Sequence, residues 1–464
     1  MAWSADRIGG ILPASILTKG LPMKKTGFGG GKGRRLAGDA FWALFGQLAS
    51  AVALLVGTRV LTEQVSPAIY GQVALLNGFV ALGVAVFSYP FICAGMRMLP
   101  ECRDSGERAD LYKVVARLTR RSTALAIAPL MFGSAVYGYL SHTDIRPFLL
   151  TGMLLAVTVR RELGIQLLIG ERKQRGASLR QTCDSILRPL LAILLVGWGG
   201  AKAEWILLGY ILASCISTIT WTSKAGNDKR PASARRFRPD VWAYALPLIP
   251  MELLFWVNGL ADRYVIGYML TAAEVGLYAA TYMIVNEAFN RSAMVLLRIF
   301  QPVYFQHASE KQFREGFRML WLWIACVVGL GVIGVSLLLV TKAWVAGWVL
   351  AKSYHSAVEL MPAIAVGCAL HALGTVVAQP LLAKKRTRWL LFGRICGAVT
   401  AAISIPLMVK DFGLPGAALA NPIYFGVEAL VLAMLARPWR NIGTEKQVAC
   451  DPAANETASC GMTA

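Results

Sequence analysis

The chain has 464 residues, of which 56% are hydrophobic and 16% are charged, whereas an average soluble domain is about 25% charged. This balance excludes an ordinary water-soluble enzyme or binding domain and indicates a protein of the lipid bilayer. The formal charge of +21 would suggest nucleic acid as the partner of a soluble protein, but we expect no nucleic acid here, because the basic residues follow the loops between hydrophobic runs.

Twelve hydrophobic runs are long enough to cross a hydrocarbon core about 30 Å thick. They are continuous and lack the alternation of barrel strands, so we predict helices. The predicted fold class is all-α: a polytopic membrane protein with about 12 transmembrane helices in two six-helix bundles. The predicted spans, in chain order, are 40–61, 70–95, 122–141, 147–170, 182–199, 204–222, 241–261, 275–299, 317–340, 358–382, 388–409 and 414–435.

Polar segments divide the chain around these spans. We predict a flexible cytoplasmic leader at 1–36, an N-terminal six-helix bundle at 37–222, a basic cytoplasmic linker at 223–240, a C-terminal six-helix bundle at 241–436 and a flexible cytoplasmic tail at 437–464. Within the leader, Met23 begins the stretch "MKKTGFGGGKGRR", which has the character of a natural start. Whether residues 1–22 are translated is therefore left open.

The basic residues are unequally distributed between alternate loops. Most lie in segments that share a side with the N-terminus, while the loops of the other side hold only Arg146, Lys202, Arg263, Lys342, Lys352 and Lys410. Cytoplasmic loops carry the excess of Lys and Arg. The distribution therefore predicts that both termini are cytoplasmic.

Cysteines and histidines give no sign of a bound metal. The nine cysteines and four histidines are scattered, without a close CxxC pair or the spacing of metal ligands. We expect no metal site and no cofactor.

Charged residues inside the spans are informative, because a charge near the bilayer centre costs about 2.5–3.5 kcal/mol on insertion scales. The fourth span carries Arg160, Arg161 and Glu162 close to its middle. Neighbouring residues of a helix point about 100° apart. We therefore expect at least one of the two arginines to face an interior.

The eighth span carries a polar stripe formed by Asn286, Glu287, Asn290 and Arg291, with Arg298 two turns further on. Residues three and four apart share one face of a helix. The spacing predicts an ion pair between Glu287 and Arg291.

Three other spans add single charges. Glu252 follows Pro247 and Pro250 in the seventh span, where proline frees backbone carbonyls and bends the helix. Arg188 and Arg394 lie in the fifth and eleventh spans. Glu428 in the last span is interpreted as a residue satisfied by packing.

These charges predict a water-filled cavity with a cationic bias, since guanidinium groups bind phosphate oxygens bidentately. Intramembrane ion pairs that only hold helices together are the alternative interpretation. Buried carboxylates can also carry protons, so Glu162, Glu252 and Glu287 are candidates for coupling to an ion gradient. The candidate substrate-binding residues are Arg160, Arg161, Arg188, Asn290, Arg291 and Arg394.

Two segments repeat in the two halves of the chain. "RVLTEQVSPAIYGQVALLNGF" follows the first span and "YVIGYMLTAAEVGLYAATYMI" follows the seventh, with Gly71 opposite Gly276. Repeated halves with a binding cavity between them are typical of transporters.

The run "ADRYVIGYMLTAAEVGLYAATYMI" resembles the signature after the seventh helix in polysaccharide-export flippases, the Wzx-type branch of the multidrug/oligosaccharidyl-lipid/polysaccharide exporter superfamily. Similar motifs are "RVLTEQVSPAIYGQVAL", "LAKKRTRWLLFGRICGAV" and "FGLPGAALANPIYFG", and the resemblance covers roughly residues 38–436.

The resemblance implies a transporter rather than an enzyme, located in the bacterial inner membrane. It implies a V-shaped pair of bundles that alternates between inward-open and outward-open states. The cargo would be a polyprenyl-pyrophosphate-linked oligosaccharide for exopolysaccharide, capsule or O-antigen (lipopolysaccharide) synthesis. The implied partners are this lipid-linked substrate, membrane lipids, and polysaccharide polymerase and assembly proteins.

The resembling run begins with a charged pair, Asp262 and Arg263, at the predicted periplasmic end of the seventh span. We expect a hinge-side ion pair that latches the two bundles in one state, or an ordinary loop salt bridge.

Three other functions remain as alternatives. A drug or organic-cation antiporter of the same superfamily would favour a cavity dominated by carboxylates, and a lipid II flippase typically carries two additional helices. A membrane polysaccharide polymerase or ligase usually needs a sizeable periplasmic loop, and every predicted outside loop is short.

Overall fold

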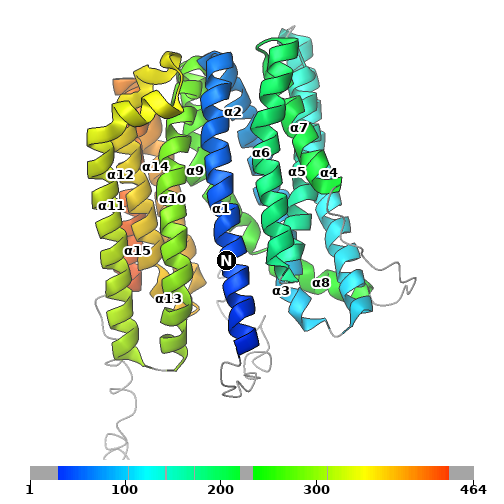
Figure 1. The fold of residues 1–464 in the computed structure, drawn as a ribbon, viewed down its shortest axis with the longest axis vertical. Coiled ribbons are helices and arrows are strands. Elements are labelled where there is room, and N and C mark those ends of the chain that lie inside the picture. The colour runs from blue at the N-terminus through cyan, green and yellow to red at the C-terminus, as the bar shows by residue number, and fades with distance from the viewer. Residues whose placement is uncertain are drawn as a thin grey trace, which may run out of the picture.

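The computed structural model of the protein describes residues 30–102, 104–141, 144–171, 173–219, 234–310 and 312–437. All regular structure in these ranges is helical (Figure 1), which confirms the predicted all-α class. The helices are α1 (Gly30–Gln64), α2 (Pro67–Leu82), the π-helix η3 (Gly83–Ser88), α3 (Tyr89–Met98), the short 3-10 helix η4 (Leu99–Glu101), α4 (Ser105–Ser141), α5 (Arg146–Gly170), α6 (Gln174–Gly199), α7 (Ala203–Ile219), α8 (Ala234–Ala245), α9 (Leu248–Met269), α10 (Ala272–Ser309), α11 (Phe313–Val349), the 3-10 helix η5 (Lys352–Leu360), α12 (Met361–Val377), α13 (Gln379–Ala383), α14 (Thr387–Phe412) and α15 (Leu414–Ala436).

The predicted spans coincide with helices or with continuous runs of helices wherever the structure describes them. Within the described residues, eight helices or runs are long and apolar enough to cross a membrane. α4, α5 and α10 are not among the eight, and α5 and α10 carry several of the charged and amide side chains that the sequence places inside the membrane. The chain is therefore a multi-pass, all-α membrane protein.

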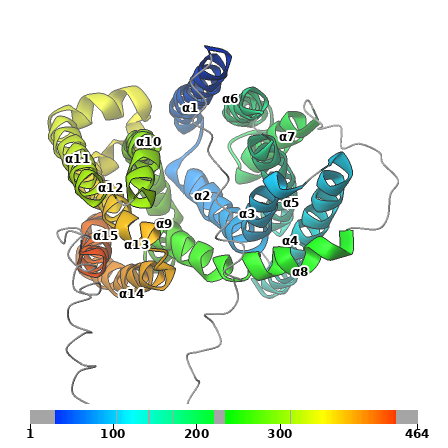
Figure 2. The same ribbon diagram turned by 90° about the horizontal axis from the view of Figure 1, so that it is seen from below.

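The helices pack in two groups. α1 to α7 form one group and α9 to α15 the other, and most contacts lie within a group, but α2 of the first group packs most extensively against α10 of the second. Figure 2 shows the first group on one side and the second on the other, with α1, α2 and α9 along the boundary between them. We call these the first and second groups.

The ends of the predicted segments differ in detail from the helix limits. α1 already begins at Gly30, inside the predicted leader, and α8 occupies the last part of the predicted linker. α8 packs on α3 and α4, where Val241 and Ala245 join a buried cluster with Phe91 and Leu111. The rest of the predicted leader, linker and tail, at 1–29, 220–233 and 438–464, lies outside the described residues.

The two groups meet closely at the end of the molecule where the α1–α2 and α9–α10 turns lie, the upper end in Figure 1. Proline occupies the first position of α2, which suits a helix start. α10 begins with a capping box in which Thr271 accepts a hydrogen bond from the Glu274 backbone and the Glu274 carboxylate accepts one from the Thr271 backbone. Both turns are thus fixed by the residues that start the following helix.

Gly71 and Gly276 allow α2 and α10 to approach. A Cβ on Gly71 would lie 1.8 Å from the carbonyl oxygen of Ala272, and a Cβ on Gly276 would lie 1.9 Å from that of Pro67. The two glycines that match in the repeated segments therefore form one reciprocal contact, and neither position accepts a side chain unless the helices separate.

Hydrogen bonds extend this contact along the boundary. Tyr354 donates to the carbonyl of Val65 at 3.2 Å, and Tyr264 donates to that of Leu75 at 2.8 Å. Trp256 donates to the carbonyl of Gly78 at 2.9 Å. We call the contact of α2 with α10, together with these bonds, the seal; it closes the boundary between the groups at the upper end.

Candidate functional site

A cavity of about 570 Å³ lies between the two groups, lined by α1, α2, α5, α6 and α7 of the first group and by α10 of the second. Its volume is within the range of roughly 300–1,000 Å³ that is usual for ligand pockets. We call it the central cavity. Its charged lining residues are Arg161, Glu162, Asp184, Arg188, Arg291 and Arg298.

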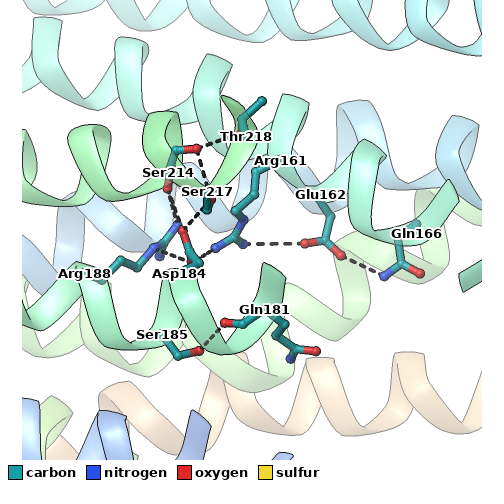
Figure 3. Close-up of polar contacts among 10 residues, drawn as sticks. All are labelled: Arg161, Glu162, Gln166, Gln181, Asp184, Ser185, Arg188, Ser214, Ser217 and Thr218. Atoms are coloured by element: carbon teal, nitrogen blue, oxygen red, sulfur yellow. Dashed lines mark hydrogen bonds and ion pairs between the residues drawn. The ribbon is translucent and has the colours of Figure 1, made fainter. Parts of the chain in front are cut away.

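The centre of the charged cluster is Asp184 on α6, whose side chain is buried (Figure 3). Arg161 of α5 donates a hydrogen bond to the Asp184 carboxylate, and Arg188, one turn further along α6, places Nε 3.0 Å from Asp184 Oδ2. One carboxylate thus holds two guanidinium groups from neighbouring helices. The Glu162 carboxylate also lies 3.5 Å from Arg161, so two carboxylates face these two cations.

Two serines of α7 complete the surroundings of Asp184. Ser214 donates to Asp184 Oδ1 at 3.2 Å and Ser217 donates to the same oxygen at 3.4 Å. Arg188 also donates to the Ser214 hydroxyl at 3.1 Å. A buried carboxylate is stable only when charges and hydrogen bonds compensate it, and here three helices supply them.

Glu162 faces the same cavity as Arg161 and lies 3.5 Å from it. Gln166, one turn further along α5, donates to Glu162 at 2.7 Å. These contacts fix the Glu162 side chain at the wall of the cavity (Figure 3).

The second group contributes Arg291 and Arg298 from α10. Arg291 pairs with Glu287 one turn earlier, which confirms the predicted ion pair. It also donates to the backbone carbonyl of Gln47 at 2.9 Å and to its side-chain amide oxygen at 2.6 Å. Because Gln47 belongs to α1, Arg291 links the two groups across the cavity.

The structure separates the predicted substrate-binding residues into three places. Arg161, Arg188 and Arg291 line the central cavity. Arg161 is therefore the arginine of the fourth span that faces an interior, as expected for at least one of the pair. The neighbouring Arg160 is exposed and lines neither this cavity nor the next one. Asn290 and Arg394 line a separate cavity of about 240 Å³ inside the second group, which we call the second cavity.

The candidates for ion coupling are also dispersed. Glu162 lines the central cavity, and Glu287 borders it through its pair with Arg291. Glu252 is half-buried on α9 and lines neither cavity. Glu428, interpreted as a packing residue, is buried and pairs with Arg394.

The predicted ion pair between the side chains of Asp262 and Arg263 is wrong: within the described part of the chain, each side chain contacts a different tyrosine. Asp262 is buried in the second group and accepts a hydrogen bond of 2.6 Å from Tyr278. The Arg263 guanidinium instead lies over the ring of Tyr282, 5.3 Å from its centroid. Adjacent residues point about 100° apart on a helix, so the two side chains take different directions.

The hydrogen bonds of Asp262 continue within the second group. Asn421 donates to the Tyr278 hydroxyl at 2.7 Å, and Tyr424 donates to the Asn421 amide oxygen at 2.7 Å. All these residues belong to α9, α10 and α15. Asp262 therefore connects helices of one group and makes no latch between the two groups.

The most important residue that the sequence analysis missed is Asp184. It precedes Arg188 by four residues inside the fifth predicted span, and this spacing brings opposite charges together on one helix face. The same signal identified Glu287 and Arg291, so it was available. Gln47, Ser214 and Ser217 carried no comparable signal, because isolated amides and hydroxyls are common in membrane helices.

Comparison with known proteins finds similarity in structure but not in sequence. No protein-family model matches the chain, and no curated protein matches it in sequence. The structure is similar to the lipid II flippase MurJ in an inward closed conformation, with a TM-score of 0.67 and 12% identity over 86% of this chain and 87% of that one.

Two further solved structures are multidrug resistance MATE family transporters of the MOP superfamily. An inward-facing conformation matches with a TM-score of 0.65 and 13% identity, over 85% of this chain and 94% of that one. An outward-facing conformation matches with a TM-score of 0.56 and 14% identity, over 84% of this chain and 94% of that one. The chain therefore has the fold that these structures of a lipid flippase and of MATE transporters share.

Proposed function

We propose that this protein is an inner-membrane flippase that moves polyprenyl-pyrophosphate-linked oligosaccharide repeat units from the cytoplasmic to the periplasmic leaflet, for exopolysaccharide, capsule or O-antigen synthesis. The observation that carries the proposal is the charge of the central cavity, in which four arginines line the wall with two carboxylates. Guanidinium groups bind phosphate oxygens in a bidentate manner, so such a cavity suits a diphosphate.

Arg161, Arg188 and Arg291 are the proposed diphosphate ligands, and Arg298 adds a fourth cation on α10. Gln47, Gln166 and the serines beside Asp184 offer hydrogen bonds to sugar hydroxyls. The prenyl chain stays in the surrounding lipid, so the cavity does not need to hold it.

Alternating access between segments 37–222 and 241–436 is the proposed mechanism. With both termini in the cytoplasm, the seal lies on the periplasmic side, and this conformation receives cargo from the cytoplasmic leaflet. The TM-scores for the inward closed flippase and the inward-facing MATE structure, 0.67 and 0.65, are higher than the 0.56 for the outward-facing MATE structure, which is consistent with a closed periplasmic side. Opening of the seal would release the product to polymerase and assembly proteins.

Proton coupling through Glu162, Glu252 and Glu287 is part of the proposal, because carboxylates within a membrane can carry protons. Replacing each glutamate in turn by Gln should weaken the dependence of flipping on a pH gradient. An unchanged dependence in all three variants would exclude the coupling role.

The second candidate function is a drug or organic-cation antiporter, since MATE transporters share the fold. A lipid II flippase is a third, since MurJ shares it as well. The excess of arginine in the central cavity favours an anionic over a cationic cargo. It does not separate two diphosphate lipids from each other, so the cargo must be identified chemically.

The test is to delete the gene and analyse the lipid-linked glycans that accumulate. We expect an accumulated lipid-linked oligosaccharide that faces the cytoplasm, and its composition would identify the cargo. Accumulated lipid II would assign the third candidate. Normal polysaccharide export without any accumulation would contradict the flippase assignment.

A further inference from the structure

The second cavity, of about 240 Å³, lies among α9, α10, α12, α14 and α15. It is far larger than the roughly 10–15 Å³ that a single water needs, and smaller than the roughly 300 Å³ at which pockets for drug-sized ligands begin. Its size therefore suits a compact ligand of one ring. Its polar lining residues are Tyr282, Asn286, Asn290, His371, Thr375 and Arg394.

Several of these polar groups have unused hydrogen-bonding capacity. The side-chain amides of Asn286 and Asn290 make no hydrogen bond to any other described residue, and each amide has two N–H donors and an acceptor oxygen. His371 Nδ1 and Arg394 Nε are buried without a partner in the described part of the chain. Buried polar groups inside a membrane protein are normally satisfied, so the two buried nitrogen atoms, together with the amides of the half-buried Asn286 and the exposed Asn290, suit a ligand with many hydroxyl groups.

The second cavity has no surplus charge. Arg394, 6% exposed, pairs with Glu428, which is 1% exposed and also accepts a hydrogen bond of 3.0 Å from Asn258. The pair is internally neutral, whereas four arginines face three carboxylates around the central cavity when Glu287, the partner of Arg291, is included. A neutral cavity disfavours a diphosphate and favours an uncharged ligand.

Aromatic rings form the apolar part of the wall. Phe255 and Phe425 line the cavity. The Arg394 guanidinium lies 4.7 Å from the centroid of the Phe255 ring, and His371 lies 4.7 Å from Phe425, ring centre to ring centre. A sugar ring has C–H faces and hydroxyl edges, so it can contact flat apolar surfaces and amides together.

The position of the second cavity connects it with the central one. Tyr282, Asn286, Asn290 and Met294 follow one another at intervals of four along α10 and face the second cavity. Arg291 and its neighbours on the adjacent face of the same turns line the central cavity. Asn290 and Met294 are exposed, so the second cavity opens beside the place where Arg291 would hold a diphosphate.

We propose that the second cavity is a binding site for one uncharged pyranose ring, and that it selects a sugar of the cargo oligosaccharide. The selection of cargo rests on the proposed flippase function, whereas the binding of a sugar ring does not. The same chemistry would also accept a free monosaccharide, and the experiment separates the two sources.

The experiment uses the full chain in nanodiscs of phospholipid without glycolipid. Binding of free neutral hexoses, N-acetylhexosamines and uronic acids is measured by saturation-transfer NMR, with glycerol as the control for weak hydroxyl binding. We expect one or a few neutral rings to bind in the millimolar range, and uronic acids to bind more weakly. Inorganic pyrophosphate is titrated on the same samples by calorimetry to report on the central cavity.

Three variants locate the site. Asn286→Ala with Asn290→Ala removes both amides and should weaken sugar binding by about fivefold or more. Ala293→Phe places a ring where Ala293 lines the cavity and should abolish sugar binding. The control is Val295→Phe, an exposed position of the same helix that lines neither cavity, and it should bind sugar like the parent protein.

Each outcome decides between the proposals. Pyrophosphate binding without binding of any sugar ring would overturn the second cavity as a sugar site and leave the flippase proposal intact. Sugar binding that survives in both the double alanine variant and Ala293→Phe would also overturn it. Sugar binding that these variants abolish, in a protein that flips no lipid-linked oligosaccharide, would support a free-sugar site and reject the flippase proposal. If Ala293→Phe does not fold, the double alanine variant alone decides.

Discussion

The two cavities on either side of α10 are built from the same kinds of side chain but differ in their balance of charge. In the central cavity, Asp184 is shared by Arg161 and Arg188. In the second cavity, one arginine meets one carboxylate, Arg394 with Glu428, and both are almost fully buried. The number of arginines alone therefore does not define an anion site; what matters is the balance of charges, which is four arginines against Glu162, Asp184 and the paired Glu287 around the central cavity and one arginine against one carboxylate at the second.

This difference predicts different consequences of mutation. In the second cavity, loss of one partner leaves a charge buried without compensation, so stability should suffer most. In the central cavity, loss of an arginine removes a ligand from the wall, so binding of an anion should suffer most.

The largest expected effect is on stability. Glu428→Gln removes the partner of Arg394 and should lower the free energy of unfolding by about 3–5 kcal/mol, because breaking a buried ion pair leaves an uncompensated charge. Denaturant titration in detergent measures this. The double variant Arg394→Met with Glu428→Leu should regain most of the loss; a double variant as unstable as Glu428→Gln would contradict the interpretation.

The next effect is on anion binding, and two neighbouring arginines provide the comparison. Arg161→Gln removes a central-cavity cation and should weaken pyrophosphate binding by about 10- to 100-fold, since hydrogen bonds to charged groups contribute about 1.5–3 kcal/mol each. Arg160→Gln makes the same chemical change at the exposed neighbour and should change binding by less than about twofold. Calorimetric titration of inorganic pyrophosphate distinguishes them, and equal losses would reject the cavity as the binding site.

A third effect concerns access to the central cavity rather than its charge. Gly71→Leu forces α2 away from α10 and should raise labelling of a Ser185→Cys reporter from the periplasmic side by about tenfold, a shift of about 1.4 kcal/mol in favour of the open seal. A membrane-impermeant maleimide reports it in a background whose native cysteines are replaced by serine. Gly197→Leu is the matched control, because a Cβ there meets nothing within 4 Å. Equal labelling of the two variants would show that the glycine contact is no seal.

The smallest effect is expected at the hydroxyls around Asp184. Ser214→Ala removes one donor to Asp184 and one acceptor of Arg188 and should weaken pyrophosphate binding by about two- to tenfold, since a neutral hydrogen bond contributes about 0.5–1.5 kcal/mol. The same titration measures it. A loss as large as that of Arg161→Gln would mean that the serine, and not the charge, organises the cluster.

Helical periodicity allowed much of the fold to be predicted. The length of the hydrophobic runs located the spans, and helical spacing indicated that at least one of two adjacent arginines faces an interior and paired Glu287 with Arg291. The repeat between the two halves aligned Gly71 with Gly276, and the structure adds that these two glycines are in direct reciprocal contact. These features depend on spacing within one helix or on repetition between halves, and both are visible in one sequence.

The assignment of residues to cavities was not predictable in this way. Asn290 and Arg291 are adjacent, yet they line different cavities, because the contents of each cavity depend on which helices pack on either side of α10. Asp262 illustrates the same limit. Its neighbour in sequence suggested an ion pair, but tertiary packing brought Tyr278 to the carboxylate instead.

Flipping of a lipid-linked oligosaccharide in proteoliposomes tests the proposed flippase function most directly. Purified protein is reconstituted with a fluorescent polyprenyl-pyrophosphate oligosaccharide, and the fraction of label that a membrane-impermeant quencher reaches is followed over time. We expect translocation by the parent protein and by Arg160→Gln, and its loss in Arg161→Gln. Equal rates in Arg161→Gln and in the parent protein, or no translocation above that of protein-free liposomes, would contradict the proposed function.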